Sequence, residues 1–242
     1  MGTFEARVSR LTDLTHDVRQ IDLAVLGPEP FQFAAGQFVS FEVARPGFAH
    51  PLTRPYSIAS APGATHVELV LNLVHDGTVS PYLFGLGVGD RTTFTGPTGT
   101  FCLPRQPKHE LLFVATGTGI APVRSMLLSL AETRCDRPVT LFWGLRSERD
   151  VYYQDELRQL QEMLPHFSFT TTLTRPSGPW TGAVGTVTSL VESRIASVAN
   201  LEAFVCGNEG MIRDVTAALR RKGLCPIHRE QYYRDAPAPQ TA

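Results

Sequence analysis

Near its middle the chain reads Leu111-Leu112-Phe113-Val114-Ala115-Thr116-Gly117-Thr118-Gly119-Ile120-Ala121-Pro122. It opens on a continuous apolar run, which is typical of strands buried on both faces of a parallel sheet. Two glycines follow, and then apolar residues at helical spacing over 123–132. The order predicts a strand, a tight turn and a helix. In such a unit the glycines let the backbone approach a pyrophosphate, and the helix dipole favours the anion.

The turn departs from the usual dinucleotide-binding fingerprint. It reads G-x-G-x-x-P, so a proline replaces the third glycine. Pro122 suits the start of a helix, because its missing N–H is not needed there. The strand-turn-helix context therefore favours a nucleotide site more than the glycines alone would.

The rest of the second half alternates strands and helices. Strands are predicted at 139–144, 167–173 and 203–207, and helices at 154–164, 187–191 and 211–222, the last ending at Gly223. Alternation of this kind predicts a parallel sheet with ligands at its carboxyl edge, where Gly117, Gly119 and Cys206-Gly207 fall. The tail over 226–233 holds Glu230, and residues 235–242 look disordered.

Short strands separated by turn residues fill the first half. We expect them at 4–9, 18–26, 36–43, near Arg54, at 67–74 and at 91–94, with turns at 27–30 and 45–47 and a tight loop at 96–101. This spacing predicts an antiparallel barrel or sandwich. Residues 103–107 hold two prolines, and we place the domain boundary there: 1–104 and 105–242.

The strand at Arg54-Pro55-Tyr56-Ser57 combines a cation, an aromatic ring and a hydroxyl. Arg54 could bind a phosphate through its planar fork, and Tyr56 on the same face could stack on a flat ring. Ser57 could hydrogen-bond the polar edge of that ring. These groups describe a flavin nucleotide site; the alternative is an ordinary half-buried strand.

Residues 77–86 predict a second phosphate contact. Ser80 is placed as the N-cap and Pro81 as the first residue of a short helix. With Gly77 just before it, this helix start could meet a flavin pyrophosphate. The alternative is a turn into a capped helix that binds nothing.

Composition narrows the function classes. Hydrophobic residues make up 43% of the 242, and the net charge of −1 argues against a nucleic-acid binder. No apolar run of 18 residues predicts a membrane span, and the first residues do not resemble a signal peptide, so we expect the cytoplasm. The scattered cysteines predict neither disulfides nor an iron–sulfur cluster, and no metal site is expected.

Taken in order, the motifs resemble those of the ferredoxin–NADP⁺ reductase superfamily, above all bacterial ferredoxin reductases and oxygenase reductase components. The resemblance covers roughly 5–233. It implies a flavin-binding antiparallel β-barrel followed by an NAD(P)-binding α/β domain. The motifs that carry it are Arg54-Pro55-Tyr56-Ser57, the segment 77–80, Gly96-Pro97-Thr98-Gly99, the segment 117–122 and Cys206-Gly207-Asn208-Glu209-Gly210-Met211.

The resemblance also implies roles for individual residues. Arg54, beside Pro55, would contact the flavin phosphate, Tyr56 would stack on the isoalloxazine and Ser57 would lie near its N5 and O4. The flavin pyrophosphate would lie against Gly77, Val79 and Ser80. The NAD(P) side would use Thr116, Gly117, Gly119, Pro122, Gly207 and Met211.

The same comparison places Cys206 and Glu230 near the nicotinamide, and Tyr232 or Tyr233 as an aromatic near the flavin. Tyr56, Ser57, Cys206 and Glu230 are thus the predicted catalytic group. Hydride transfer needs no nucleophile, so Ser57 and Cys206 are interpreted as orienting groups. Cys206 fits equally well as a buried core thiol.

The nicotinamide nucleotide is the open cofactor question. Arg146, Arg149 and Arg175 are positioned to meet a 2′-phosphate, and the first and last match positions that do so in some NADPH-using relatives. The alternative is that they are solvated surface arginines. We favour NADPH over NADH, with FAD as the flavin by resemblance.

Three functions remain open from the sequence. The first is a reductase, expected to be a monomer, that passes single electrons from bound FAD to a ferredoxin or oxygenase component. The second is an NAD(P)H:free-flavin reductase. The third is a non-catalytic flavoprotein subunit or redox sensor.

Overall fold

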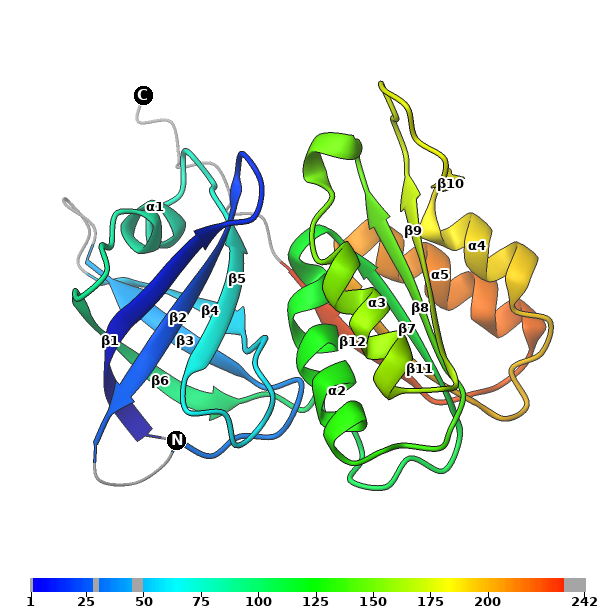
Figure 1. Ribbon diagram of the computed structural model, residues 1–242, viewed down its shortest axis with the longest axis horizontal. Coiled ribbons are helices and arrows are strands. Elements are labelled where there is room, and N and C mark those ends of the chain that lie inside the picture. The colour runs from blue at the N-terminus through cyan, green and yellow to red at the C-terminus, as the bar shows by residue number, and fades with distance from the viewer. Residues whose placement is uncertain (1, 28–30, 45–49, 233–242) are drawn as a thin grey trace.

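The computed structural model describes residues 2–27, 31–44 and 50–232. Figure 1 shows two domains side by side, a sheet domain from the first half of the chain and an α/β domain from the second half. The predicted turns at 27–30 and 45–47, Tyr233 and the tail at 235–242 lie wholly or partly outside the described residues. Within the described part, no helix is both long enough and apolar enough to span a membrane.

The first domain is one antiparallel sheet in the order β4-β3-β6-β1-β2-β5. Its strands are β1 (Gly2–Asp13), β2 (Val18–Leu26), β3 (Phe38–Val43), β4 (Leu52–Ser57), β5 (Val67–Asn72) and β6 (Arg91–Thr98). An antiparallel bridge between Ile58 and Leu69 joins the two ends of this order. The sheet thereby closes into the predicted barrel, and α1 (Val79–Phe84) packs near β3 and β4.

Aromatic rings fill the barrel interior. Phe94 is 1% exposed, and its ring lies 5.7 Å from Phe4, 5.4 Å from Phe31 and 5.9 Å from Phe41, centroid to centroid. Alternation along β6 turns this ring inward while its neighbours face outward. Buried aliphatic side chains complete this core, among them Ile21, Leu23, Ile58 and Leu69.

The second domain is a parallel sheet in the order β10-β9-β8-β7-β11-β12. Its strands are β7 (Glu110–Thr116), β8 (Val139–Leu145), β9 (Phe167–Leu173), β10 (Ala183–Val184), β11 (Leu201–Gly207) and β12 (Ile227–Gln231). The helices are α2 (Ile120–Glu132), α3 (Gln154–Met163), α4 (Val187–Arg194) and α5 (Glu209–Lys222). Side chains of α2 and α3 pack on one face of the sheet and those of α4 and α5 on the other.

The apolar run that begins at Leu111 forms β7 in the middle of this sheet, as predicted. Its residues from Leu111 to Ala115 are at most 1% exposed, because helices cover both faces. Helices α2 and α3 lie on the face toward the barrel, so they form the domain junction (Figure 1). The predicted boundary at 104 stays a prediction; it lies in the segment between the end of β6 and the start of β7.

Several predicted element boundaries were wrong, and four of them bear on the site. Strand β6 continues to Thr98, where a tight loop was expected, because β3 pairs with it as far as Thr98. Helix α1 begins at Val79 with Thr78 as its N-cap, and α2 begins at Ile120, so Pro122 is its third residue. Helix α5 begins at Glu209, because the Asn208 side chain accepts a hydrogen bond from the Met211 N–H.

Strand β12 was not predicted as a strand. Its sequence, Ile227-His228-Arg229-Glu230-Gln231, shows no apolar run, which is why pattern alone did not indicate one. It is a strand because it pairs in parallel with the free edge of β11, from Ala203 opposite Ile227 to Gly207 opposite Gln231. This pairing has a functional consequence, since β12 holds Glu230 beside Cys206.

Candidate functional site

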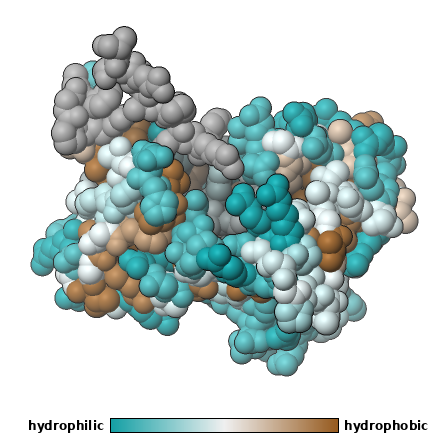
Figure 2. All heavy atoms as spheres, turned by 90° about the horizontal axis from the view of Figure 1, so that it is seen from above, coloured by the Kyte–Doolittle hydropathy of each residue, from teal (hydrophilic) through white to brown (hydrophobic). Residues whose placement is uncertain are grey.

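A large cleft lies between the two domains at the carboxyl ends of the parallel strands. Its volume is about 1330 Å³. The barrel contributes His16, Asp17, Val18 and residues 72–74 and 76 to its walls, and the α/β domain contributes the turns after β7, β8 and β11. Figure 2 looks onto the molecule from above and shows mainly hydrophilic residues between the domains. The predicted carboxyl-edge site is therefore a cleft shared by both domains.

The glycine turn forms part of this cleft. Gly117 has a φ of +54°, and a Cβ added there would meet nothing within 4 Å. A Cβ on Gly119 would instead lie 2.5 Å from the carbonyl oxygen of Cys206. The two glycines thus have different structural roles. Gly117 leaves the backbone open toward the cleft, and Gly119 lets the turn pack directly on the end of β11.

Replacement of Gly119 by alanine is expected to destabilise the protein by about 1–3 kcal/mol, because the new methyl group overlaps backbone that cannot rotate away. Gly117→Ala is the matched control, since its methyl group enters open space and adds only left-handed backbone strain of about 1 kcal/mol. Thermal unfolding of both variants measures the difference. Equal melting temperatures for the two variants would contradict this packing account.

A second group of predicted residues meets across the domain junction. Ser57 at the end of β4 donates a hydrogen bond of 2.8 Å to a carboxylate oxygen of Glu230 on β12. The Tyr232 hydroxyl donates to the Ser57 hydroxyl at 3.0 Å and lies 3.5 Å from the Thr118 carbonyl. The Cys206 thiol lies 3.9 Å from the same carboxylate oxygen of Glu230. One cluster therefore joins the barrel, the glycine turn and the end of the chain.

Burial sets the protonation of this cluster. Loss of hydration raises the pKa of Glu230 to about 7, although the bonds from Ser57 and Cys206 oppose the shift. Burial, together with the Glu230 carboxylate, raises the pKa of the Cys206 thiol well above its usual range. Burial likewise raises the pKa of Tyr232. The thiol is thus neutral, which agrees with an orienting or packing role and argues against a nucleophile.

Strand β4 presents the remaining flavin-site candidates. Arg54 and Tyr56 share a half-buried face, as the alternation predicted, and the Tyr56 ring lies edge-on to Phe41 at 5.9 Å. Pro55 points the other way and is exposed. Since Ser57 is the next residue of the same strand, the cation, the ring and the hydroxyl of this motif follow one another toward the Glu230 cluster.

The start of α1 differs from the prediction, because Ser80 is not its N-cap. The side chains of Val79 and Ser80 are buried, and the Ser80 hydroxyl accepts a hydrogen bond from the Val74 N–H at 3.0 Å. The hydroxyl therefore fixes the preceding turn, while Gly77 is half-buried at the surface. The Ser80 hydroxyl thus has a structural partner within the barrel domain.

Arg146 and Arg175 lie next to each other at the ends of β8 and β9. The Arg175 N–H donates to the Arg146 carbonyl at 2.7 Å, and both side chains are exposed. The Glu148 carboxylate accepts from the N–H groups of Ser177 and Gly178, which holds the loop after β9 in place and lowers the pKa of Glu148. Arg146 and Arg149 line the cleft.

The other predicted nucleotide residues surround the glycine turn. Gly207 has a φ of +151°, and a Cβ there would lie 2.2 Å from the Thr116 hydroxyl and 2.8 Å from the Met211 terminal methyl group. These three residues are thus in mutual contact at the cleft wall, to which all belong. Pro122 is buried in the first turn of α2.

Sequence reasoning missed several residues that line or support the cleft. Asn208 lines the cleft and caps α5, a role that its type and its place before a helix could have signalled. Trp143 and Tyr152 donate hydrogen bonds to the Gly117 carbonyl at 3.0 and 3.3 Å. No local pattern in the sequence indicates a contact between residues so far apart.

Two cofactors fit these groups. The open space at Gly117 and the exposed backbone of the turn suit a dinucleotide pyrophosphate. The half-buried cation and ring on β4, with hydroxyl groups of Ser57 and Tyr232 beyond them, suit a flavin with a phosphate at one end and a polar ring edge at the other. The donor sets thus match FAD on the barrel and NAD(P) on the α/β domain.

Comparison with known proteins agrees with both assignments. Residues 5–102 match the oxidoreductase FAD-binding domain, and residues 113–217 match the oxidoreductase NAD-binding domain. Ferredoxin–NADP reductase B of Sorangium cellulosum is 32% identical, over 95% of this chain and 97% of its own length.

Other relatives are longer than this chain. The ferredoxin–NAD(P)⁺ reductase component of the naphthalene 1,2-dioxygenase/salicylate 5-hydroxylase systems of Ralstonia is 31% identical over 93% of this chain and 68% of its own length. The crystal structure of an Amycolatopsis cytochrome P450 reductase superposes with a TM-score of 0.83 at 29% identity, covering 95% of this chain and 69% of that one. The chain thus spans about two thirds of these proteins.

The predicted family and the two-domain fold are therefore confirmed. A barrel that fits FAD, a parallel sheet that fits NAD(P) and a relative matched over 97% of its own length lead to the same assignment. The chain belongs to the ferredoxin–NADP⁺ reductase superfamily and is a flavin-dependent NAD(P)H oxidoreductase.

Proposed function

We propose that this protein passes hydride from NAD(P)H to bound FAD and then single electrons to a ferredoxin or an oxygenase component. The observation that supports this most directly is the cluster of Ser57, Glu230 and Tyr232, which joins the barrel to the nucleotide domain beside the glycine turn. A site where two rings must meet needs groups from both domains at one place. Bound FAD supplies the chemistry, because it accepts a hydride and releases electrons one at a time.

On the barrel, we assign Arg54 and Tyr56 to the flavin phosphate and the flavin ring, with Pro55 shaping the strand between them. Ser57 would hydrogen-bond the polar edge of the ring. Backbone amides of Gly77, Val79 and Ser80 would face the pyrophosphate. Support comes from the order of these groups along β4 and from the contact of α1 with β4.

On the α/β domain, Thr116, Gly117 and Gly119 would bind the nucleotide pyrophosphate, with Gly207 and Met211 forming the wall and Pro122 supporting the turn. Glu230 would hold or release a proton near neutral pH, since its pKa is about 7. Cys206, fully buried and neutral, would exclude water and fix Glu230 from behind. We also propose NADPH as the preferred donor, through Arg146 and Arg175.

The acceptor proposal rests on the names of relatives. The Ralstonia relative is the reductase component of a dioxygenase system, and another of 30% identity, from Rhodococcus jostii, is the reductase component of propane 2-monooxygenase; this chain covers 60% of that protein's length. We propose a monomer, since the described chain holds both cofactor regions. The four free cysteines fit a reducing compartment such as the cytoplasm.

Anaerobic mixing of the purified protein with NADPH, and separately with NADH, tests the proposal. We expect a yellow protein whose visible absorbance is bleached, faster by NADPH. Colourless protein that oxidises NAD(P)H only after flavin is added would support a free-flavin reductase instead. Yellow protein that reacts with neither nucleotide would contradict the proposal and favour a non-catalytic subunit or sensor. When the protein is bleached as expected, added oxidised ferredoxin should restore its visible absorbance.

A further inference from the structure

Two adjacent tyrosines between β8 and α3 contact different parts of the molecule, one the glycine turn and the other the barrel. The Tyr152 ring is 7% exposed, and its hydroxyl donates to the Gly117 carbonyl in the glycine turn. The Tyr153 hydroxyl donates to the Gln20 side chain of barrel strand β2 at 2.6 Å. Residue 153 has left-handed backbone angles, φ 56° and ψ 12°. That conformation is uncommon for a bulky side chain and marks a place where the surrounding structure holds the backbone.

The inner tyrosine belongs to the support of the glycine turn. The Gly117 carbonyl also accepts a hydrogen bond from the Trp143 ring N–H at 3.0 Å, and the two aromatic rings pack edge to face with centroids 4.8 Å apart. Trp143 is fully buried in β8. Two rigid donors therefore fix the carbonyl of the residue whose backbone opens into the cleft, and with it the direction of the neighbouring amides.

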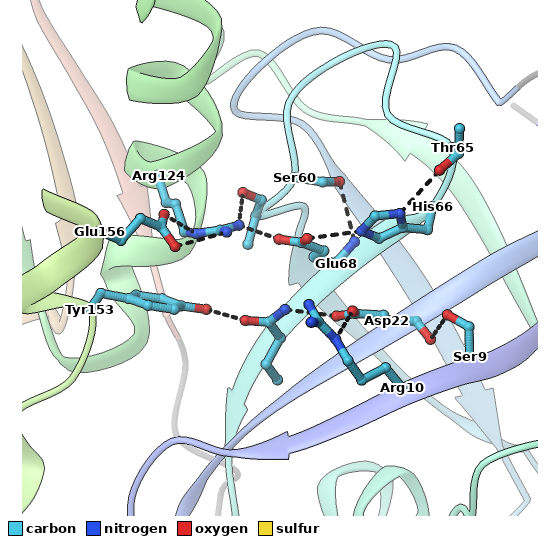
Figure 3. A network of polar contacts seen from close by, with 12 residues as sticks. Ser9, Arg10, Asp22, Ser60, Thr65, His66, Glu68, Arg124, Tyr153 and Glu156 are labelled. Atoms are coloured by element: carbon cyan, nitrogen blue, oxygen red, sulfur yellow. Dashed lines mark hydrogen bonds and ion pairs between the residues drawn. The ribbon is translucent and has the colours of Figure 1, made fainter. Parts of the chain in front are cut away.

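The outer tyrosine belongs to the domain junction. The guanidinium of Arg124, on α2, lies over the Tyr153 ring at 5.0 Å and donates to the Ala59 carbonyl of the barrel at 2.8 Å. It also pairs with Glu68 of β5 and with Glu156 of α3. Figure 3 shows Arg124 and Tyr153 pointing from the α/β domain to the barrel side chains.

The barrel side of this junction is equally fixed. Gln20 is 5% exposed, and its amide donates to Asp22 at 2.7 Å, which in turn accepts from Arg10 at 2.6 Å (Figure 3). The Tyr153 hydroxyl therefore donates into a connected chain of polar groups in which Gln20 and Asp22 are buried, so small movements there are costly.

We propose that Tyr152 and Tyr153 are positioning residues that tie the glycine turn to the flavin barrel and so set how the nicotinamide meets the flavin. The inference rests on the proposed cofactor sites. Because the two residues are neighbours on one constrained backbone, a shift of one domain against the other moves the support of the turn as well. Tyr152 governs the turn, and Tyr153 governs the distance between the two domains.

The test uses two conservative variants of the flavin-loaded protein, Tyr152→Phe and Tyr153→Phe. Stopped-flow bleaching at several NADPH concentrations separates the nucleotide Kd from the limiting rate of flavin reduction. For Tyr153→Phe we expect a limiting rate lower by about 10-fold with little change in Kd, because displacement of the reacting rings by a fraction of 1 Å slows transfer. For Tyr152→Phe we expect the Kd to rise about 3- to 10-fold, as for one lost hydrogen bond.

Coupling between the two sites is read from the double variant. The effect of each substitution on the Kd and on the limiting rate should differ by more than about 2-fold between the wild-type protein and the protein that already carries the other substitution. Tyr82→Phe is the matched control, since its hydroxyl bonds Thr92 within the barrel at 3.0 Å and should leave both Kd and limiting rate unchanged.

Two outcomes would overturn the proposal. One is a Tyr153→Phe protein with the wild-type limiting rate. The other is a pair of variants that alter only Kd, which would confine both residues to the nucleotide site. If the wild-type protein itself is not bleached by either nucleotide, the proposed function fails, and that result is distinct from a bleached wild type with an unaffected Tyr153→Phe variant.

Discussion

Glu230→Gln is expected to slow flavin reduction by NAD(P)H by about 10²-fold, comparable to the loss of one preorganised electrostatic contact in an active site. As hydride leaves, the nicotinamide ring would become positively charged, and Glu230, which we propose lies beside it, would stabilise that charge. Glutamine keeps the shape and a partner for Ser57, whose hydroxyl donates to Glu230 at 2.8 Å, but it cannot supply the charge. Single-turnover bleaching measures the rate.

The same carboxyl should give the reaction its pH dependence. With a pKa of about 7, Glu230 becomes ionised as pH rises through neutrality, so the wild-type rate should increase across pH 6–8. The Gln variant should be slow and flat over this range. Glu202→Gln is the control: Glu202 is also buried, on neighbouring strand β11, but it pairs with His228 at 2.8 Å. A Glu230→Gln rate within 3-fold of wild type would reject the role.

The folding stability of the wild-type protein should fall as pH rises, whereas its rate of flavin reduction should increase. The pKa of Glu230 is raised in the folded state above the usual 4.5, so the native protein binds more protons than the unfolded chain between about pH 4.5 and 7. Wild-type stability therefore declines as pH rises through this window, by up to about 3 kcal/mol, and the full cost is present above pH 7. Glu230→Gln avoids that cost, so at pH 8 the variant should have a higher melting temperature than the wild type.

The double variant Arg146→Ala/Arg175→Ala is expected to raise the KM for NADPH by about 10²-fold and leave the KM for NADH unchanged. Each exposed, charge-assisted contact to a 2′-phosphate contributes about 1.5 kcal/mol, at the low end of its range because solvent screens it. NADH lacks that phosphate. A backbone hydrogen bond of 2.7 Å joins the two residues, and Arg146 lines the cleft.

Steady-state kinetics with both nucleotides measures this effect. Arg194→Ala serves as control, because Arg194 is an exposed arginine of the same domain that bonds Thr170 at 2.8 Å on β9. An equal rise in KM for both nucleotides would mean that the arginines only shape the cleft. A wild-type protein that already prefers NADH would contradict the NADPH proposal.

The sequence was sufficient where the signal is local. Period-2 alternation located β2 and β3, and the apolar run before Gly117 located the central strand of the parallel sheet. Local signals were misleading where pairing overrides them: β6 runs through Gly96-Pro97, residues that normally end a strand, because β3 continues alongside it.

Long-range contacts were beyond a single sequence. The polar composition of β12 gives no strand signal, and only its parallel partner β11 explains it. Glu230 was found through family resemblance, but its bond to Ser57 depends on how two domains pack. The sequence did not predict the roles of Trp143 and Tyr152. Both side chains donate to the Gly117 carbonyl, and every residue has such a backbone group, so no side-chain pattern indicates the contact.

The position of β12 has a consequence for how the protein folds during its synthesis. Ser57 belongs to β4, and its partner Glu230 follows 173 residues later in the chain. A nascent chain can close its barrel and fold most of its parallel sheet early, because domains fold as units from the N-terminal end. The Ser57 hydroxyl lacks its Glu230 partner until β12 is synthesised and pairs with β11, so the barrel cannot assemble the proposed site before the second domain folds.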